Sequence, residues 1–133
     1  MYSQYDKQYG IQKEKEIKPF LVKHFGALSE TPPNDNFDFY NDKYTIEVKS
    51  RRVGINTYPS QMVGLNKVEA GKRIIENGKV VLFVFNLTDG VYYWIQNDNY
   101  KTRIGGRCDR GRPEYKQYCY IDRKDLIHLA EEP

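Results

Sequence analysis

Hydrophobic residues along the chain first recur with the spacing of a helix. One buried stripe is predicted by four of them: Ile17, Phe20, Leu21 and Phe25. They predict a helix from about Tyr5 to Phe25, and Gly26 suits its C-terminal cap. A second set recurs at helical spacing after the loop VGINTYPS: Met62, Leu65, Val68 and Ile75. It predicts a second helix that ends at about Gly78.

Elsewhere the hydrophobic residues alternate with polar ones or run together, as they do in strands. Strands are predicted at five places: about Phe37–Tyr40, Lys43–Arg52, Lys79–Asn86, Val91–Gln96 and Lys116–Ile121. Asn41-Asp42 joins the first pair as a two-residue turn, and Thr88-Asp89-Gly90 joins the second. A short last helix is expected from Asp122, with Asp125 three residues on as in a capping box. Together these elements predict a mixed α/β domain, with helices flanking a central mixed β-sheet.

Size and composition limit the classes of protein that the chain can form. The 133 residues, 29% charged and 39% hydrophobic, fit a single globular domain over 1–133. The longest apolar run, Val80 to Phe85, is far shorter than the roughly 20 residues of a membrane helix. Because no secretory signal is visible, we expect a cytosolic protein of a bacterial, archaeal or virus-infected cell. Cys108 and Cys119 are then expected as reduced thiols, with a disulfide as the alternative.

The net charge of +3 is small, but it is unevenly distributed. Between Lys101 and Lys116 there are six basic and two acidic residues, a local charge of +4. Gly105, Gly106 and Pro113 make the segment 99–116 loop-like, and tyrosines surround it. The candidate phosphate contacts there are Lys101, Arg103, Arg107, Arg110 and Arg112. A solvated basic loop without a partner is the alternative interpretation.

The stretch NFDFYNDKYTIEVKS, from Asn36 to Ser50, carries the candidate chemistry. With Asn41-Asp42 as the turn, alternation puts Phe37, Phe39, Tyr44, Ile46 and Val48 on the core face of the hairpin. Asp38, Glu47 and Lys49 then share the other face, with Asp38 and Glu47 as diagonal neighbours. Two carboxylates at that distance can bind one cation, and oxygen ligands favour Mg²⁺ or Mn²⁺ over zinc. A solvated cross-strand ion cluster remains the alternative.

The first helix supplies one more candidate ligand. At about 100° per residue, Glu14 falls close to the line through Leu21 and Phe25, whereas Glu16 falls well away from it. Glu14 is therefore expected to point inward, where a carboxylate needs a partner such as the cluster around Asp38. Its alternative role is a favourable interaction with the helix dipole. His24 and His128, the latter expected in the last helix, are interpreted as structural residues.

Three local matches give the sequence a family resemblance. The segments GIQKEKEI (residues 10–17), FDF around Asp38, and EVKSR (residues 47–51) resemble the helix, aspartate and strand motifs of the PD-(D/E)xK nuclease superfamily. Within it the chain is most similar to archaeal-type Holliday-junction resolvases and their viral relatives. The residue before the aspartate is Phe37 rather than proline, and Asp35 is the second choice for the aspartate itself. The segment after Asn99 has no counterpart that we can place.

The resemblance implies a restriction-endonuclease-like core and Mg²⁺- or Mn²⁺-dependent phosphodiester hydrolysis. In that case Asp38, Glu47 and the Val48 carbonyl hold the metal, with Glu14 bound directly or through water. Lys49 orients the attacking water or stabilises the transition state, and the products carry a 5′-phosphate and a 3′-hydroxyl. Gln61, near the start of the second helix, either faces the site or simply begins that helix.

The leading functional hypothesis is therefore a DNA endonuclease that prefers branched, junction-like DNA and acts as a homodimer. Arg51, Arg52 and the basic segment are the expected DNA contacts. A restriction- or repair-type nuclease acting on linear duplex is one alternative. The other is a module that binds nucleic acid without catalysis.

Overall fold

The fold is described from a computed structural model of the chain, which covers residues 4–32, 35–107 and 114–129. Side chains are described for residues 8–32, 35–104 and 116–129. Arg110, Arg112 and Cys108 lie outside the described residues, and for Arg107 the backbone alone is described. Within the described parts, no helix is long and apolar enough to cross a membrane.

A six-stranded mixed sheet forms the centre of the fold. Its strands are β1 (Ser29–Glu30), β2 (Phe39–Tyr40), β3 (Tyr44–Ser50), β5 (Val80–Leu87), β6 (Gly90–Ile95) and β9 (Ile127–Leu129). They lie in the order β1-β2-β3-β5-β6-β9, with β3 and β5 parallel and the other neighbours antiparallel. The mixed α/β class and its restriction-endonuclease-like core are confirmed.

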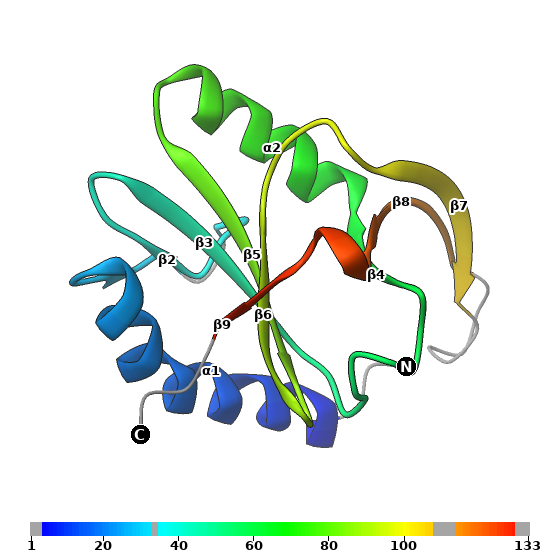
Figure 1. The fold of residues 1–133 in the computed structure, drawn as a ribbon, viewed down its shortest axis with the longest axis horizontal. Coiled ribbons are helices and arrows are strands. Elements are labelled where there is room, and N and C mark those ends of the chain that lie inside the picture. Colours follow the sequence, from blue (N-terminus) through cyan, green and yellow to red (C-terminus); the bar gives the residue numbers. More distant parts are fainter. Residues whose placement is uncertain (1–3, 33–34, 108–113, 130–133) are drawn as a thin grey trace.

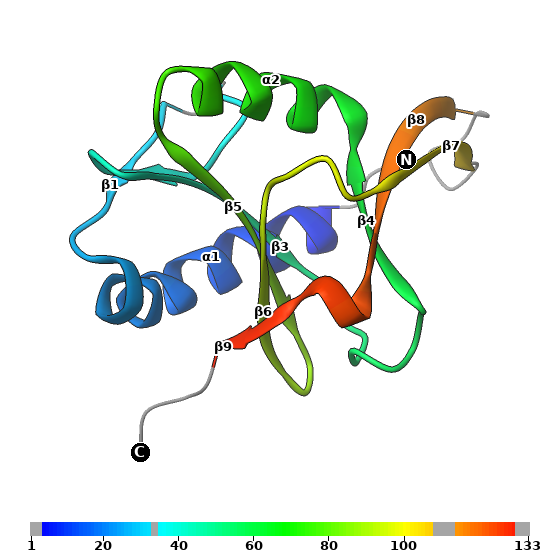
Figure 2. The same cartoon turned by 45° about the horizontal axis from the view of Figure 1, so that its top comes forward.

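Two helices cover opposite faces of this sheet (Figures 1 and 2). Helix α1 (Gln4–Phe25) packs Ile17 and Leu21 against Ile46 of β3, in one core cluster. Helix α2 (Leu65–Glu76) packs Val68 on the other face, against residues of β5 and β6 in a second cluster. The sheet therefore separates two cores, and each strand side chain belongs to one of them.

Both predicted helices exist, but the second begins later than expected. Helix α1 ends one residue before Gly26, whose φ of 89° confirms the predicted left-handed cap. Met62 belongs to strand β4 (Ser60–Gly64) instead of α2. Ile75 is 37% exposed, and Ile74 packs against the core in its place. The helical spacing was wrong at both ends because the apolar positions of a short strand and of a helix cannot be distinguished over so few residues.

The β2–β3 hairpin is displaced by two residues from its predicted register. Phe39 pairs with Ile46 and Tyr40 with Thr45, because the turn forms around the side chain of Asn41. Asn41 Oδ1 accepts hydrogen bonds from Lys43 N at 2.9 Å and from Tyr44 N at 2.7 Å. Since side chains alternate with a period of two, this displacement leaves each β3 residue on its predicted face.

Phe37 is the exception to the predicted faces. Strand β2 starts only at Phe39, and before it Asp35 Oδ1 accepts a 3.1 Å hydrogen bond from Phe37 N. The Phe37 ring lies 6.1 Å from that of Phe83, in the core on the α2 side, whereas Phe39 packs on the α1 side. Local bonds in the loop before β2 override the strand alternation there.

A second, three-stranded sheet contains the segment predicted as a basic loop. Its strands run in the order β4, β8 (Glu114–Asp122) and β7 (Lys101–Arg107). The loop prediction was wrong, because Gly105 and Gly106 lie within β7 opposite Lys116 and Tyr115. Glycine disfavours a strand locally, but pairing of β7 with β8, and of β8 with β4, outweighs that preference. Figure 1 shows the β7–β8 ribbon extending beyond one end of α2.

The predicted last helix is a single 3-10 turn. Helix η1 (Arg123–Asp125) is capped by Asp122, whose side chain accepts a 3.0 Å hydrogen bond from Lys124 N, and the chain then enters β9. Asp122 therefore caps a helix as predicted, but that helix is one turn long. His128 lies on β9 and stacks on Tyr92, at a ring distance of 4.8 Å. His24 packs its ring against Phe20. Cys119 is a buried free thiol.

Candidate active site

Asp38 and Glu47 come together beside the middle of β3. Glu47 lies on the strand itself, on the face toward α2, and is 3% exposed. Asp38 lies just before β2, where its backbone N donates to Ile46 O at 2.9 Å. Its Oδ2 accepts a 2.7 Å hydrogen bond from Val48 N. The hairpin therefore holds both carboxyl groups in one place, as the sequence predicted.

Two lysines bind the same oxygen of Glu47. Lys49 Nζ lies 3.1 Å from Glu47 Oε2, and Lys67 Nζ lies 3.0 Å from that atom. Lys67 is on the first turn of α2 and also donates a 2.6 Å hydrogen bond to Asn36 O. The other oxygen, Glu47 Oε1, is buried and accepts no hydrogen bond within the described residues. A proton on Asp38, or a cation between the two carboxyl groups, would satisfy it.

Crowding of acidic groups changes the proton affinity of Asp38. Burial, followed by the negative charge of Glu47, raises the pKa of Asp38 from 3.8 to about 7, although the hydrogen bond from Val48 N opposes the rise. Burial also raises the pKa of Glu14, and the charges of Glu47 and Glu30 add to that effect. The cluster therefore carries an excess of negative charge that a cation would relieve.

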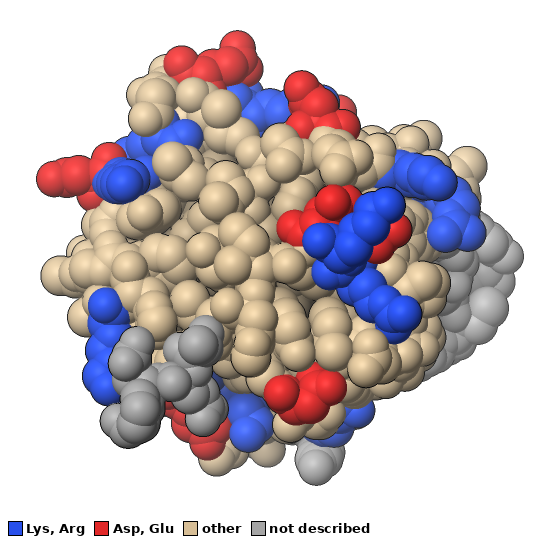
Figure 3. Space-filling view, in the orientation of Figure 1, with Lys and Arg blue, Asp and Glu red and all other residues tan. Residues whose placement is uncertain are grey.

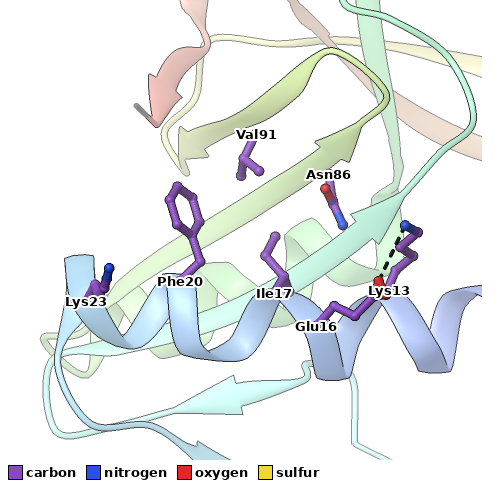
Figure 4. Close-up of a pocket in the computed structure, with 7 residues that line it drawn as sticks. All are labelled: Lys13, Glu16, Ile17, Phe20, Lys23, Asn86 and Val91. Atoms are coloured by element: carbon purple, nitrogen blue, oxygen red, sulfur yellow. Dashed lines mark ion pairs between the residues drawn. The ribbon is translucent and has the colours of Figure 1, made fainter. Parts of the chain in front are cut away.

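Glu14 is half-buried and feels the charge of this cluster, whereas Glu16 is exposed. The pKa of Glu14 responds to the charges of Glu47 and Lys67, which places the three groups within electrostatic reach of one another. Glu16 instead pairs with Lys13 at 3.4 Å, over a shallow pocket of about 310 Å³ (Figure 4). That pocket lies between α1 and the β5–β6 hairpin. The half-burial of Glu14 and the exposure of Glu16 agree with the helical stripe.

The residues that converge here fit a hard divalent cation. Both carboxylates are anchored, one by Val48 N and the other by two lysines, and one carboxylate oxygen remains without a donor. Oxygen donors of this kind suit Mg²⁺ or Mn²⁺. Among the described side chains, no three acidic, histidine or cysteine groups already converge closely enough to form a complete metal cluster. Asp38 and Glu47 are thus a pair, with Glu14 as a more distant third carboxylate.

The two lysines that bind Glu47 also line a cleft between the two sheets. Lys49 and Lys67 line one side of an open cleft of about 570 Å³, and Lys116 and Tyr118 of β8 line the other side. Strand β8, which belongs to the basic segment that the sequence did not connect to the site, therefore forms one wall of this cleft. A negatively charged chain entering the cleft would meet lysines on both sides.

Arg51 and Gln61 form an internal contact beside the site. Arg51 Nη1 donates to Gln61 Oε1 at 2.7 Å, and Nη2 donates to Met62 O. The guanidinium lies 5.6 Å from the Phe85 ring, and burial lowers the pKa of Arg51 to about 10. Gln61 lies on β4, 2% exposed, and not at the start of α2 as predicted. This contact joins the end of β3 to the edge of β4.

The other predicted DNA contacts lie on the outer part of the molecule. In the second sheet, Gln61, Val63, Cys119 and Ile121 face the core, so alternation places Lys101, Arg103, Tyr118 and Tyr120 on the outer face. Figure 3 shows Lys and Arg side chains close together where Figure 1 places β7 and β8. Arg52 is exposed, with its guanidinium 4.0 Å from the Tyr9 ring.

Lys67 is the residue of the site that sequence analysis missed. It belongs to no EVKSR-like motif, and its position one residue before the buried Val68 gave no indication of its partner. The asparagine carbonyl and the glutamate that it contacts lie 31 and 20 residues earlier in the chain. Only the packing of α2 across the sheet reveals the contact.

The fold and this carboxylate–lysine cluster are those expected of the PD-(D/E)xK superfamily. The chain also matches, over residues 2–129, the model of the family described as "Phage putative PDDEXK endonuclease". It therefore belongs to that family of endonucleases, whose substrate is DNA and whose members generally use divalent metals. No curated protein and no solved structure gives a significant match.

Proposed function

We propose that the chain is a metal-dependent endonuclease that hydrolyses phosphodiester bonds in DNA at the Asp38–Glu47 cluster. The observation that supports this most strongly is the buried Glu47, which has two lysines on one oxygen and no partner on the other. Glu47 also lies beside the partly buried Asp38, and two carboxylates that close to each other repel, which is unfavourable for the fold alone. Its cost is explained if the cluster binds a cation.

In this mechanism Asp38 and Glu47 would hold Mg²⁺ or Mn²⁺, together with the Val48 carbonyl and with Glu14, either directly or through water. When bound, the metal activates water and neutralises charge on the phosphate. Lys49 positions the attacking water, and its ammonium stabilises the charge that builds up on the phosphate. We assign Lys67, which binds the same oxygen of Glu47, a similar electrostatic role. The expected products carry a 5′-phosphate and a 3′-hydroxyl.

Branched DNA is the proposed substrate, held by the outer face of the second sheet. Lys101, Arg103 and Arg52 would contact phosphates, with Arg107, Arg110 and Arg112 extending the same basic segment. A four-way junction has two-fold symmetry, and cutting it symmetrically requires two sites, so the active form would be a homodimer. Arg51 supports the site from within, because its guanidinium is bonded to Gln61 and Met62.

Cleavage assays test the proposal directly. Purified protein would be incubated with a labelled four-way junction, a linear duplex and a single strand, first with Mg²⁺ and then with EDTA. We expect junction cleavage that requires metal and is lost in Glu47→Gln and Lys49→Ala. Glu14→Gln should reduce the rate, whereas its matched control Glu16→Gln, on the other side of α1, should not.

The pattern of cleavage distinguishes the alternatives. Preference for the linear duplex would replace the junction assignment with a restriction- or repair-type activity. Absence of cleavage on every substrate, with DNA binding intact, would leave a non-catalytic binding module and would refute the proposed chemistry.

A further inference from the structure

A second pocket lies two residues along the strands from the cleft beside the proposed catalytic site. It has a volume of about 390 Å³ and lies where the loop after β3 meets the edge of β4. Its lining includes Tyr58, Tyr120 and Arg103 at the surface, and Arg51 and Gln61 deeper in the protein. The proposed function above gives no role to Tyr58 or Tyr120 and uses Arg103 only as a phosphate contact.

The walls of this pocket are aromatic and cationic. Tyr58 lines the pocket, and its side chain is 55% exposed, so its ring is open to a ligand. The Arg103 guanidinium lies 4.4 Å from the centre of the Tyr120 ring. Flat aromatic and guanidinium surfaces of this kind stack on nucleobases without selecting a sequence.

The deeper wall contains an unused hydrogen-bond donor. Gln61 Oε1 accepts from Arg51 at 2.7 Å, which fixes the amide orientation. Its Nε2 is buried and has no hydrogen-bond partner within the described residues. An unpaired buried amide costs free energy, on the order of 1–3 kcal/mol. Gln61 is among the lining residues, and although protein atoms cover Nε2, a ligand acceptor that reached it would remove that cost.

The pocket and the cleft share the same strands. On β4, Gly64 lines the cleft and Met62, two residues away, lines the pocket. On β8, Tyr118 lines the cleft and Tyr120, again two residues away, lines the pocket. Two residues of strand span roughly 6.5 Å. Lys49 and Arg51 show the same two-residue offset on the chain leaving β3. A DNA chain with a phosphate at Lys49 would therefore have a neighbouring nucleotide beside the pocket.

We propose that this pocket binds a single nucleobase that has left its stack, next to the phosphate that is cleaved. The base would stack against Tyr58 and the Arg103–Tyr120 pair, and an acceptor atom on its edge would bind Gln61 Nε2. The inference rests on the proposed nuclease function and narrows its substrate to DNA with an unpaired nucleotide. Bulges and flaps contain such a nucleotide, and a junction offers one where pairing opens at its branch point, but a continuous duplex does not.

Binding assays in EDTA test the pocket without cleavage. The probes are two otherwise identical labelled duplexes, one fully paired and one with a single unpaired nucleotide, and the readout is the ratio of their dissociation constants. We expect wild type to prefer the unpaired site, and Tyr58→Ala to lower this preference by on the order of tenfold. Tyr58→Phe retains the ring and should retain the preference. Tyr40→Ala removes a tyrosine that is 41% exposed on β2 and serves as the matched control.

A second variant tests the amide independently. Gln61→Glu keeps the acceptor for Arg51 but replaces the free donor, so the preference among the four bases at the unpaired position should change. Fluorescence of 2-aminopurine at that position reports whether the base is stacked on protein. An equal ratio of dissociation constants in wild type and Tyr58→Ala would overturn the inference.

The same variants distinguish failure of the pocket from failure of the nuclease. If wild type cuts DNA with Mg²⁺ but binds both duplexes equally, the pocket proposal is refuted and the proposed function stands. If it prefers the unpaired nucleotide through Tyr58 but cuts neither duplex nor junction, the pocket stands and the proposed function is refuted.

Discussion

The backbone amide of Val48 donates a 2.7 Å hydrogen bond to Oδ2 of Asp38. This bond ties the loop before β2 to the strand that carries Glu47, and it forces two carboxyl groups into one buried place. Val48 N also lowers the cost of the Asp38 charge, but burial and Glu47 outweigh it. Burying the two carboxylates together therefore lowers the free energy of unfolding. The site can be tested by stability measurements without any substrate.

Asp38→Asn should stabilise the metal-free protein at high pH. The folded pKa of Asp38 is about 7, above its unfolded value, so its contribution to stability is complete at pH below about 4 and is lost as pH rises through 7. Urea unfolding in EDTA should show the variant more stable by about 4 kcal/mol at pH 8 and little changed at pH 4. Asp42→Asn, at an exposed position of the turn, is the control. A less stable Asp38→Asn at pH 8 would contradict this account.

Mg²⁺ should raise the melting temperature, and more so at high pH. Binding requires both carboxylates to be deprotonated, so protons compete with metal below the folded pKa of Asp38, about 7. Thermal melts with and without Mg²⁺ at pH 8 and pH 5.5 measure the effect. Asp38→Asn and Glu47→Gln should abolish the shift. A shift that is equal at the two pH values, or that survives in Glu47→Gln, would place the metal elsewhere.

Arg51 and Arg52 are adjacent but should behave differently. Arg51→Ala leaves Gln61 Oε1 and Met62 O without their donor, so we expect a loss of about 2–4 kcal/mol in the free energy of unfolding. Arg52→Ala removes an exposed stacking contact with Tyr9 and should cost less than about 1 kcal/mol. Chemical denaturation of both variants makes the comparison. Equal losses would mean that Arg51 is not the structural link we describe.

Phosphate contacts on the outer face of β7 should show in the salt dependence of DNA binding. Arg103→Ala and Lys101→Ala should each weaken affinity for every DNA substrate and reduce the slope of log K against log salt by about 1. Lys43→Ala, an exposed lysine in the β2–β3 turn, is the control. Anisotropy titrations over a series of salt concentrations give the slopes. Unchanged slopes for Arg103→Ala and Lys101→Ala would mean that this face binds something other than phosphates.

The candidate site was largely predictable from the sequence because its parts are local. Glu47 and Lys49 lie two residues apart on one strand, and side-chain alternation alone puts them on one face. The two-residue displacement of the hairpin did not affect the prediction of the β3 faces, since it preserves that alternation. Glu14 followed from the helical stripe in the same way. Lys67 and Gln61 did not, because their partners lie on other elements and no local period encodes those contacts.

The sequence by itself determined the helix that ends at Phe25 before Gly26, the two-faced strand β3 and the motif that gathers the acidic residues. Short-range periodicity and capping suffice for these, since their energetics depend on neighbours within a few residues. The tertiary structure alone decided that residues 101–107 form a strand, that Arg51 points inward and that Phe37 changes sides. Each of these depends on pairing or packing between distant segments, whose free energy exceeds the weak local preferences of glycine, arginine and phenylalanine.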